Sequence, residues 1–228
     1  MLKELIDKFY LDKQKNREQN HFYITDAGKC GRAIFFKFKN VPREEMEARV
    51  LRMFDHGDSI HQLIMKPLLS LRKVRVVASE VDIPPQELIR GRADAIISDS
   101  KDLYVVDIKS MNSMAFRALE SPKEDNVTQL QFYLHFFKIK KGILLYVNKD
   151  TQELKEFMID YDPDLVNELL KELHQLKKKI ESNSVPGRIP SYPTNWQCKY
   201  CQFSEVCKIA GEAEIGWEVL KKKIEALD

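Results

Sequence analysis

Two aspartates and a lysine lie near the middle of the chain with a spacing that suits metal and phosphate chemistry. Asp94 precedes one short apolar run, Asp107 follows a second, and a polar turn separates the two runs. This pattern, over residues 91–109, predicts a β-hairpin with a buried second strand that ends at Asp107. Lys109 follows Asp107 at a spacing of two, so a strand places both side chains on one face.

The charges of these three groups indicate what they could bind. Two carboxylates and an ammonium group at one end of a hairpin are costly to bury without partners. A divalent cation would neutralise the carboxylates, and a phosphate beside it would pair with the lysine. The hairpin therefore predicts a site for a divalent cation and a phosphate group.

Four further polar residues are candidates for the same site, each with an ordinary structural alternative. His61 lies in a helical pattern over 44–72 and is either a metal ligand or a satisfied core or surface histidine. Glu80 lies in a strand-like stretch and is either an additional acidic group near the metal or a solvent-facing carboxylate. Gln129 and Tyr133 share one face of a predicted helix at a spacing of four, where they could also be the polar edge of a core helix.

Four cysteines form a second candidate site. Cys198, Cys201 and Cys207 follow a C-x2-C-x5-C pattern, and Cys30 lies far earlier in the chain. Zinc sites usually pair their ligands in two short C-x2-C knuckles, which this pattern lacks. Irregularly spaced thiolates suit a [4Fe–4S] cluster, which we favour over zinc or unliganded thiols. Such a centre would tie the N-terminal segment to the C-terminal one and stabilise the protein by closing a long loop.

Composition limits the class of protein. The chain has 228 residues, of which 43% are hydrophobic, enough for one sizeable core or a core with a small appendage. A net charge of +2 does not by itself mark a nucleic-acid binder. Apolar runs stay well short of the roughly 18 residues of a membrane span, and the N-terminus has no signal-peptide block. We therefore expect a cytoplasmic protein without membrane contact, whose cysteines are ligands or free thiols rather than disulfides.

Hydrophobic periodicity predicts the elements that position these residues. Lys13, Lys15 and Arg17 make the first helix a candidate DNA-facing surface, although a solvated charged face is the explanation we favour. A helix within 22–40 is expected to carry Cys30. Beside these and the hairpin, helices are expected over 2–19, 44–72, 126–139, 163–182 and 212–228, and strands within 73–90, 142–149 and 155–159.

Five motifs follow one another in the order known from one enzyme family: G-x3-H, G-R-A-D, D-I-K, Q-x3-Y and the cysteine pattern. The first four contain His61, Asp94, Asp107, Lys109, Gln129 and Tyr133. They resemble the RecB-like branch of the PD-(D/E)XK nuclease superfamily. With its cysteines, the chain is similar over about residues 25–210 to the fourth CRISPR-associated protein family and to the iron–sulfur nuclease domain of AddB. Ala93 replaces the family's name-giving proline, which removes no ligand.

The resemblance implies an α/β fold with a restriction-endonuclease-like core, in which helices flank a central mixed β-sheet. It adds a C-terminal cysteine-rich iron–sulfur staple. Residues 1–228 would form a single nuclease domain with its core at about 44–182. The iron–sulfur subregion would be formed by 22–40 and 190–210.

The resemblance also implies roles for the site residues. Lys109 would orient the attacking water or stabilise charge that develops on the phosphate. Gln129 and Tyr133 would position the DNA strand near the metal. The implied ligands of Mn²⁺ or Mg²⁺ are His61, Asp94, Asp107 and the backbone carbonyl of Ile108.

The implied function is a metal-dependent exonuclease that hydrolyses single-stranded DNA ends and carries a [4Fe–4S] cluster. It would serve CRISPR spacer acquisition or DNA recombination and repair, with CRISPR integrase proteins or a recombination helicase as partners. One alternative is a non-cleaving DNA-binding subunit of a recombination or integration complex with a structural metal site. Another is a structural protein stapled by zinc. The intact set of Asp94, Asp107 and Lys109 argues against the non-cleaving subunit.

Overall fold

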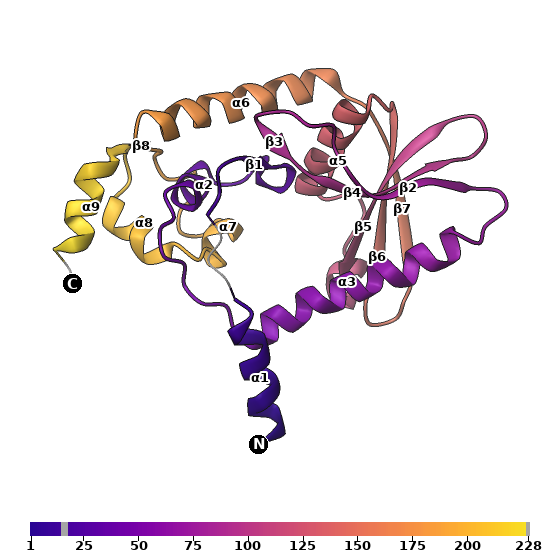
Figure 1. Ribbon diagram of the computed structural model, residues 1–228, viewed down its shortest axis with the longest axis horizontal. Helices are drawn as coiled ribbons and strands as arrows, with labels where there is room; N and C mark the ends of the chain where they lie inside the picture. Colours follow the sequence, from indigo (N-terminus) through magenta and orange to yellow (C-terminus); the bar gives the residue numbers. More distant parts are fainter. Residues whose placement is uncertain (15–17, 227–228) are drawn as a thin grey trace. The chain divides into compact units, whose positions relative to one another are not determined.

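The computed structural model describes residues 1–14 and 18–226, and Figure 1 shows its helices and strands. The chain divides into two compact units. One unit comprises residues 23–27 and 49–167, and the other comprises 1–22, 28–48 and 168–228. Lys15 and Arg17, two of the basic residues considered for DNA contact, lie outside the described residues.

A five-stranded sheet forms the centre of the first unit. Its strand order is β2-β4-β5-β6-β7. The pair β5–β6 is parallel, and the other three neighbouring pairs are antiparallel, so the sheet is mixed. The expected α/β fold with a mixed central sheet is therefore confirmed. The strands are β2 (Arg75–Asp82), β4 (Arg92–Ser98), β5 (Leu103–Met111), β6 (Lys141–Asn148) and β7 (Leu154–Asp160).

Helices cover this sheet and make the connection that a parallel pair of strands needs. Between β5 and β6 the chain passes through α4 (Ser113–Arg117) and α5 (Glu124–Phe137). At Gly142 on β6, an added Cβ would lie 2.8 Å from Leu130 of α5, so glycine permits the close approach of this helix.

The helix before the hairpin, α3 (Ala48–Leu68), packs on the strands that carry the two aspartates (Figure 1). Its residue Ile60 is buried in one cluster with Ile97 of β4 and Ile108 of β5. This apolar contact fixes the helix against the sheet and so determines where the nearby His61 can reach.

The second unit is mainly helical and is held by aromatic side chains. Phe35 and Phe36 of α2 are fully buried and pack with Phe203 and Leu220. A short antiparallel pair, β8 with β9, lies in the same unit. Its elements are α1 (Leu2–Asp12), α2 (Gly31–Phe38), β8 (Ser184–Val185), α7 (Trp196–Lys199), α8 (Ser204–Ala210), β9 (Ile215–Gly216) and α9 (Trp217–Glu225).

The remaining elements are short or contribute residues to both units. They are β1 (Phe22–Tyr23), the 3-10 helix η1 (Ile24–Asp26), β3 (Ile89–Arg90) and α6 (Pro163–Glu181). Within the described residues, no helix combines the length and the apolar character needed to cross a membrane.

Two local expectations from the sequence were wrong. Asp107 does not end its strand, because β5 pairs with β6 as far as Met111. The helix expected to carry Cys30 begins at Gly31, so the cysteine occupies the position before its first turn.

Candidate active site

The two aspartates lie where the hairpin strands part. The ladder between β4 and β5 ends at the pair of Ala95 and Val106. Extending this register by one residue would set Asp94 directly opposite Asp107, an unfavourable pairing of like charges. Instead, the Asp94 carboxylate accepts a hydrogen bond of 2.6 Å from the backbone N–H of Ile108. The side chain of Asp94 thus takes the place of the next backbone hydrogen bond between β4 and β5.

His61 brings α3 to the same carboxylate. Its Nδ1 lies 3.2 Å from Oδ1 of Asp94, and both side chains are partly exposed. The pKa of His61 is raised, first by this hydrogen bond and then by the negative charge of Asp94, against the opposing effect of burial. The imidazole is therefore protonated more easily than a free histidine, and its protonated form makes an ion pair with the carboxylate of Asp94.

Asp107 is 2% exposed and incompletely partnered. Lys109 Nζ donates a hydrogen bond of 3.0 Å to Oδ1 and forms an ion pair at 2.8 Å with Oδ2. The second contact lacks hydrogen-bond geometry, so within the described part of the chain Oδ2 is buried without a hydrogen-bond partner. Burial raises the pKa of Asp107 to about 6, although Lys109 acts in the opposite direction.

Helix α5 braces the lysine. Lys109 Nζ donates to Gln129 Oε1 at 2.9 Å, and Gln129 Nε2 donates to the Tyr133 hydroxyl at 3.3 Å. The hydroxyl in turn donates to the backbone carbonyl of Arg92 at 2.6 Å. Burial raises the pKa of Tyr133 above its usual value, so the hydroxyl stays protonated as a donor. This chain of hydrogen bonds fixes the ammonium group beside Asp107.

The structure therefore gathers six of the predicted residues, His61, Asp94, Asp107, Lys109, Gln129 and Tyr133, in one network. Glu80 does not join it. Its side chain is 69% exposed and pairs with Arg92 at 3.3 Å. Tyr133 is 2% exposed, so its hydroxyl has little surface on which a DNA strand could lie. Sequence reasoning missed the backbone N–H of Ile108 and the backbone carbonyl of Arg92, because main-chain partners leave no mark in the residue types.

Replacing Tyr133 by phenylalanine is expected to lower the free energy of unfolding by about 1–3 kcal/mol, since buried partners are left unsatisfied. Cleavage should fall only several-fold, because Gln129 loses a brace but keeps its bond to Lys109. Urea unfolding and single-turnover cleavage measure the two effects. Tyr104→Phe is the matched control, since its hydroxyl bonds the exposed Asp99 and its removal should change little. Equal effects of the two changes would contradict a brace at Tyr133.

The donor set fits a divalent cation, although the site is not preformed for one. Among residues 1–14 and 18–226, no three His, Cys, Asp or Glu side chains are arranged to hold a metal ion. The Oδ2 atom of Asp107 is nonetheless buried and has no hydrogen-bond donor in the described part of the chain, and carboxylate oxygens are preferred ligands of hard cations. His61 and Asp94 now satisfy each other, so binding by both would replace their mutual contact.

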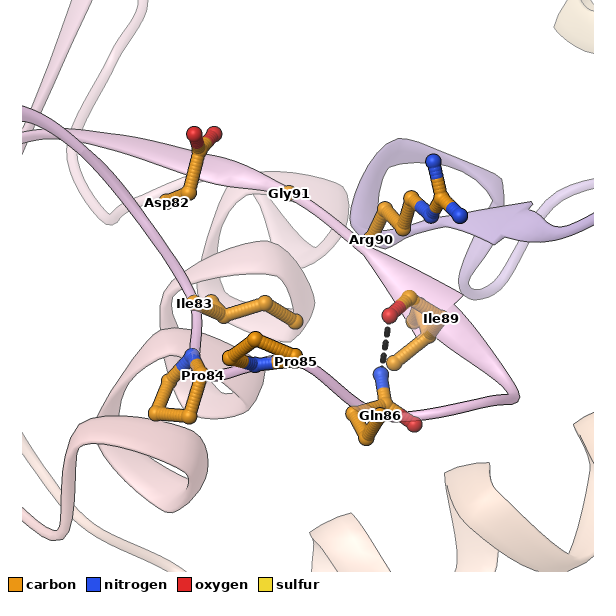
Figure 2. A pocket seen from close by; sticks show the side chains of 8 residues that line it. All are labelled: Asp82, Ile83, Pro84, Pro85, Gln86, Ile89, Arg90 and Gly91. Atoms are coloured by element: carbon orange, nitrogen blue, oxygen red, sulfur yellow. Dashed lines mark hydrogen bonds between the residues drawn. The ribbon is translucent and has the colours of Figure 1, made fainter.

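A hollow of about 360 Å³ lies next to the start of β4 but contains none of the predicted site residues. Figure 2 shows Ile83 and Pro85 on its wall, with Arg90 and Asp82 to the side. Gln86 braces its loop by a hydrogen bond to the carbonyl of Ile89. Gly91 allows no side chain, because an added Cβ would lie 2.5 Å from Ile24.

The four cysteines lie in the mainly helical unit, and among the described residues no three of them are already arranged to hold a metal ion. All are half-buried free thiols. Burial raises the pKa of Cys198 and of Cys201, and the other cysteines raise both further, which places the thiols in one electrostatic neighbourhood. The backbone N–H of Cys30 donates to Gln197 Oε1 at 2.7 Å, so the early cysteine meets the C-terminal segment.

Comparisons with known proteins agree with this architecture. The chain is 29% identical over 198 residues to the CRISPR-associated exonuclease Cas4 of Saccharolobus solfataricus, covering 84% of this chain and 89% of that protein. The crystal structure of SSO0001 superposes with a TM-score of 0.57 at 26% identity, covering 91% of this chain and 96% of that one.

A more distant structure shares the fold. It is an alkaline exonuclease from Laribacter hongkongensis, with a TM-score of 0.51 at 12% identity, covering 76% of this chain and 92% of that one. The family model for the PD-(D/E)XK nuclease superfamily matches residues 27–208, which is most of the chain. Because that match includes both candidate sites, the protein belongs to the PD-(D/E)XK nuclease superfamily.

Proposed function

We propose that this protein is a metal-dependent deoxyribonuclease that degrades single-stranded DNA from its ends. The observation that carries the proposal is the convergence of an imidazole, two carboxylates and an ammonium group where β4 and β5 part. Membership of the nuclease superfamily supports it, as does the likeness to a protein named as a CRISPR-associated exonuclease.

The cation would be held by His61, Asp94, Asp107 and the backbone carbonyl of Ile108. When bound, Mn²⁺ or Mg²⁺ supplies a positive charge that polarises the phosphodiester and makes an attacking water more acidic. The imidazole among oxygen ligands favours Mn²⁺ somewhat over Mg²⁺. The oxygen donors of Asp94 and Asp107 supply the negative charge that attracts either ion.

The remaining residues act on the phosphate and on one another. Lys109 stabilises charge that develops on the phosphate, or orients the water, from a position set by Asp107 and Gln129. Tyr133 is a positioning residue, because its buried hydroxyl joins Gln129 to the backbone of β4. The hydrogen-bond chain costs no reorganisation at the moment of reaction, which is how preorganised groups contribute to rate.

The cysteines would hold a [4Fe–4S] cluster that staples residues 22–40 to residues 190–210. Four free thiols in one electrostatic neighbourhood, drawn from distant parts of the sequence, support this assignment. We place the nuclease in CRISPR spacer acquisition, where integrase proteins would be its partners. Recombination with a helicase partner is the other setting in which a trimmed single strand is needed.

The test uses linear single-stranded DNA labelled at either end, with closed circular single strands as the control. Mn²⁺ should support stepwise shortening of the linear strand, EDTA should stop it, and the circle should survive. If the circle is cleaved at the same rate as the linear strand, the protein is an endonuclease rather than an exonuclease. Binding of the strand without cleavage in Mn²⁺ and in Mg²⁺ would overturn the proposal in favour of a non-cleaving DNA-binding subunit.

A further inference from the structure

A buried arginine lies directly beside the cysteine cluster. Arg32, in the first turn of α2, is 1% exposed. Its Nη1 donates to the sulfur of Cys207 at 3.4 Å. Its other partners are all backbone carbonyls, namely those of Pro186, Cys207, Gly211, Glu212 and Ala213, at 2.6–3.4 Å.

This guanidinium group has no counter-ion in the described residues, where no carboxylate forms an ion pair with it. A buried charge is costly unless it is paired, and carbonyl dipoles offset only part of that cost. A fully buried arginine without a carboxylate therefore points to an anion that belongs beside it. The group that it touches besides carbonyls is a cysteine sulfur.

A second arginine reaches the same cysteine from another segment. Arg188 Nη2 donates to the backbone carbonyl of Cys207 at 3.2 Å, and its guanidinium stacks on the ring of Tyr192 at 3.9 Å. In the part of the chain that the structure describes, its Nε is buried without a hydrogen-bond partner. Burial raises the pKa of Cys198, and the positive charge of Arg188 acts in the opposite direction. Two fixed cations thus flank the cysteines.

We propose that Arg32 and Arg188 are the built-in counter-charge of the metal centre, with Arg32 also donating a hydrogen bond to the Cys207 thiolate. The inference rests on the proposed [4Fe–4S] cluster. Four thiolates on the oxidised cluster core carry about two net negative charges, which two guanidinium groups balance. Nearby positive charge and N–H···S bonds favour the more negative, reduced form and so raise the reduction potential.

The experiment compares anaerobically purified wild type with Arg32→Met, Arg32→Lys and Arg188→Gln. Each is measured for iron and sulfide content, for absorbance near 400 nm and for reduction potential by optical titration. Arg32→Met and Arg188→Gln should shift the potential to more negative values, and Arg32→Lys should shift it less than Arg32→Met does. Lys39→Met is the control, because this lysine lies at the far end of α2 and bonds Asn183.

The outcomes separate this inference from the cofactor on which it rests. Wild type without iron and sulfide would overturn both the cluster and the counter-charge. If the wild type holds the cluster but either loaded arginine variant has the same reduction potential as Lys39→Met, the counter-charge alone is overturned. If Arg32→Met fails to fold, the half-buried Arg188→Gln decides the question by the same criterion.

Discussion

Replacing Lys109 by alanine is expected to lower DNA cleavage by about a thousand-fold or more while leaving the protein folded. The ammonium group contacts both oxygens of Asp107 and also Gln129, so alanine removes the positive charge that these partners hold in place. The loss should appear in the cleavage step, because stabilisation of developing charge is worth more in the transition state than in the bound substrate. Single-turnover cleavage at saturating protein measures it.

The fold should survive this change because Asp107 can respond. Burial already raises the pKa of Asp107 to about 6, and removal of Lys109 raises that pKa further, so the carboxyl group binds a proton near neutral pH. Lys141→Ala is the matched control, since its pair with Asp102 lies on the same sheet but is half-exposed. If Lys109→Ala keeps more than about a tenth of the wild-type rate, its role in the chemistry is wrong.

Replacing Asp107 by asparagine is expected to abolish cleavage and yet stabilise the metal-free protein. Asparagine keeps the shape but removes a buried charge, one oxygen of which has no hydrogen-bond donor among residues 1–14 and 18–226. A folded-state pKa above the unfolded value means that metal-free stability falls as pH rises from about 4 to about 6 and stays lower above that range. The gain at pH 8 should be at most about 3 kcal/mol, because a pKa of about 6 in place of 3.8 corresponds to that free energy and already includes the effect of Lys109.

Urea unfolding in EDTA and in Mn²⁺ tests this trade between stability and activity. Wild type should gain stability from Mn²⁺, because a ligand that binds only the folded state stabilises it. Asp107→Asn should gain much less. Asp102→Asn, at a half-exposed ion pair, should behave as wild type does. A metal-free Asp107→Asn variant that unfolds at lower urea than wild type would show that the carboxylate contributes to the fold rather than to ion binding.

The sequence predicted the proximity of the candidate side chains where they belong to one local element. The hairpin carrying Asp94 and Asp107, and the shared face of Asp107 and Lys109, follow from the period of a strand, which is a local property. The spacing of Gln129 and Tyr133 likewise follows from the period of a helix, and the two side chains are hydrogen-bonded.

What the sequence could not predict depends on partners far away in the chain. The extension of β5 to Met111 depends on β6, which is about 30 residues later and pairs in parallel with it. The ion pair of Glu80 with Arg92 depends on the register of β2 against β4, so an acidic residue in a strand could not be assigned to a partner beforehand. The carbonyls around Arg32 belong to loops whose paths leave no periodic pattern.

The carboxylate of Asp94 accepts the hydrogen bond of a backbone N–H that would ordinarily be donated to a backbone carbonyl of the neighbouring strand. Any ion or proton that binds this carboxylate draws electron density from it and so weakens the hydrogen bond that it accepts from the backbone N–H of Ile108. That amide is buried in the middle of the sheet, so its magnetic resonance frequency can change for few other reasons. The protein thus carries its own reporter of occupancy at the Asp94 carboxylate, and loading could be followed without substrate, label or dye.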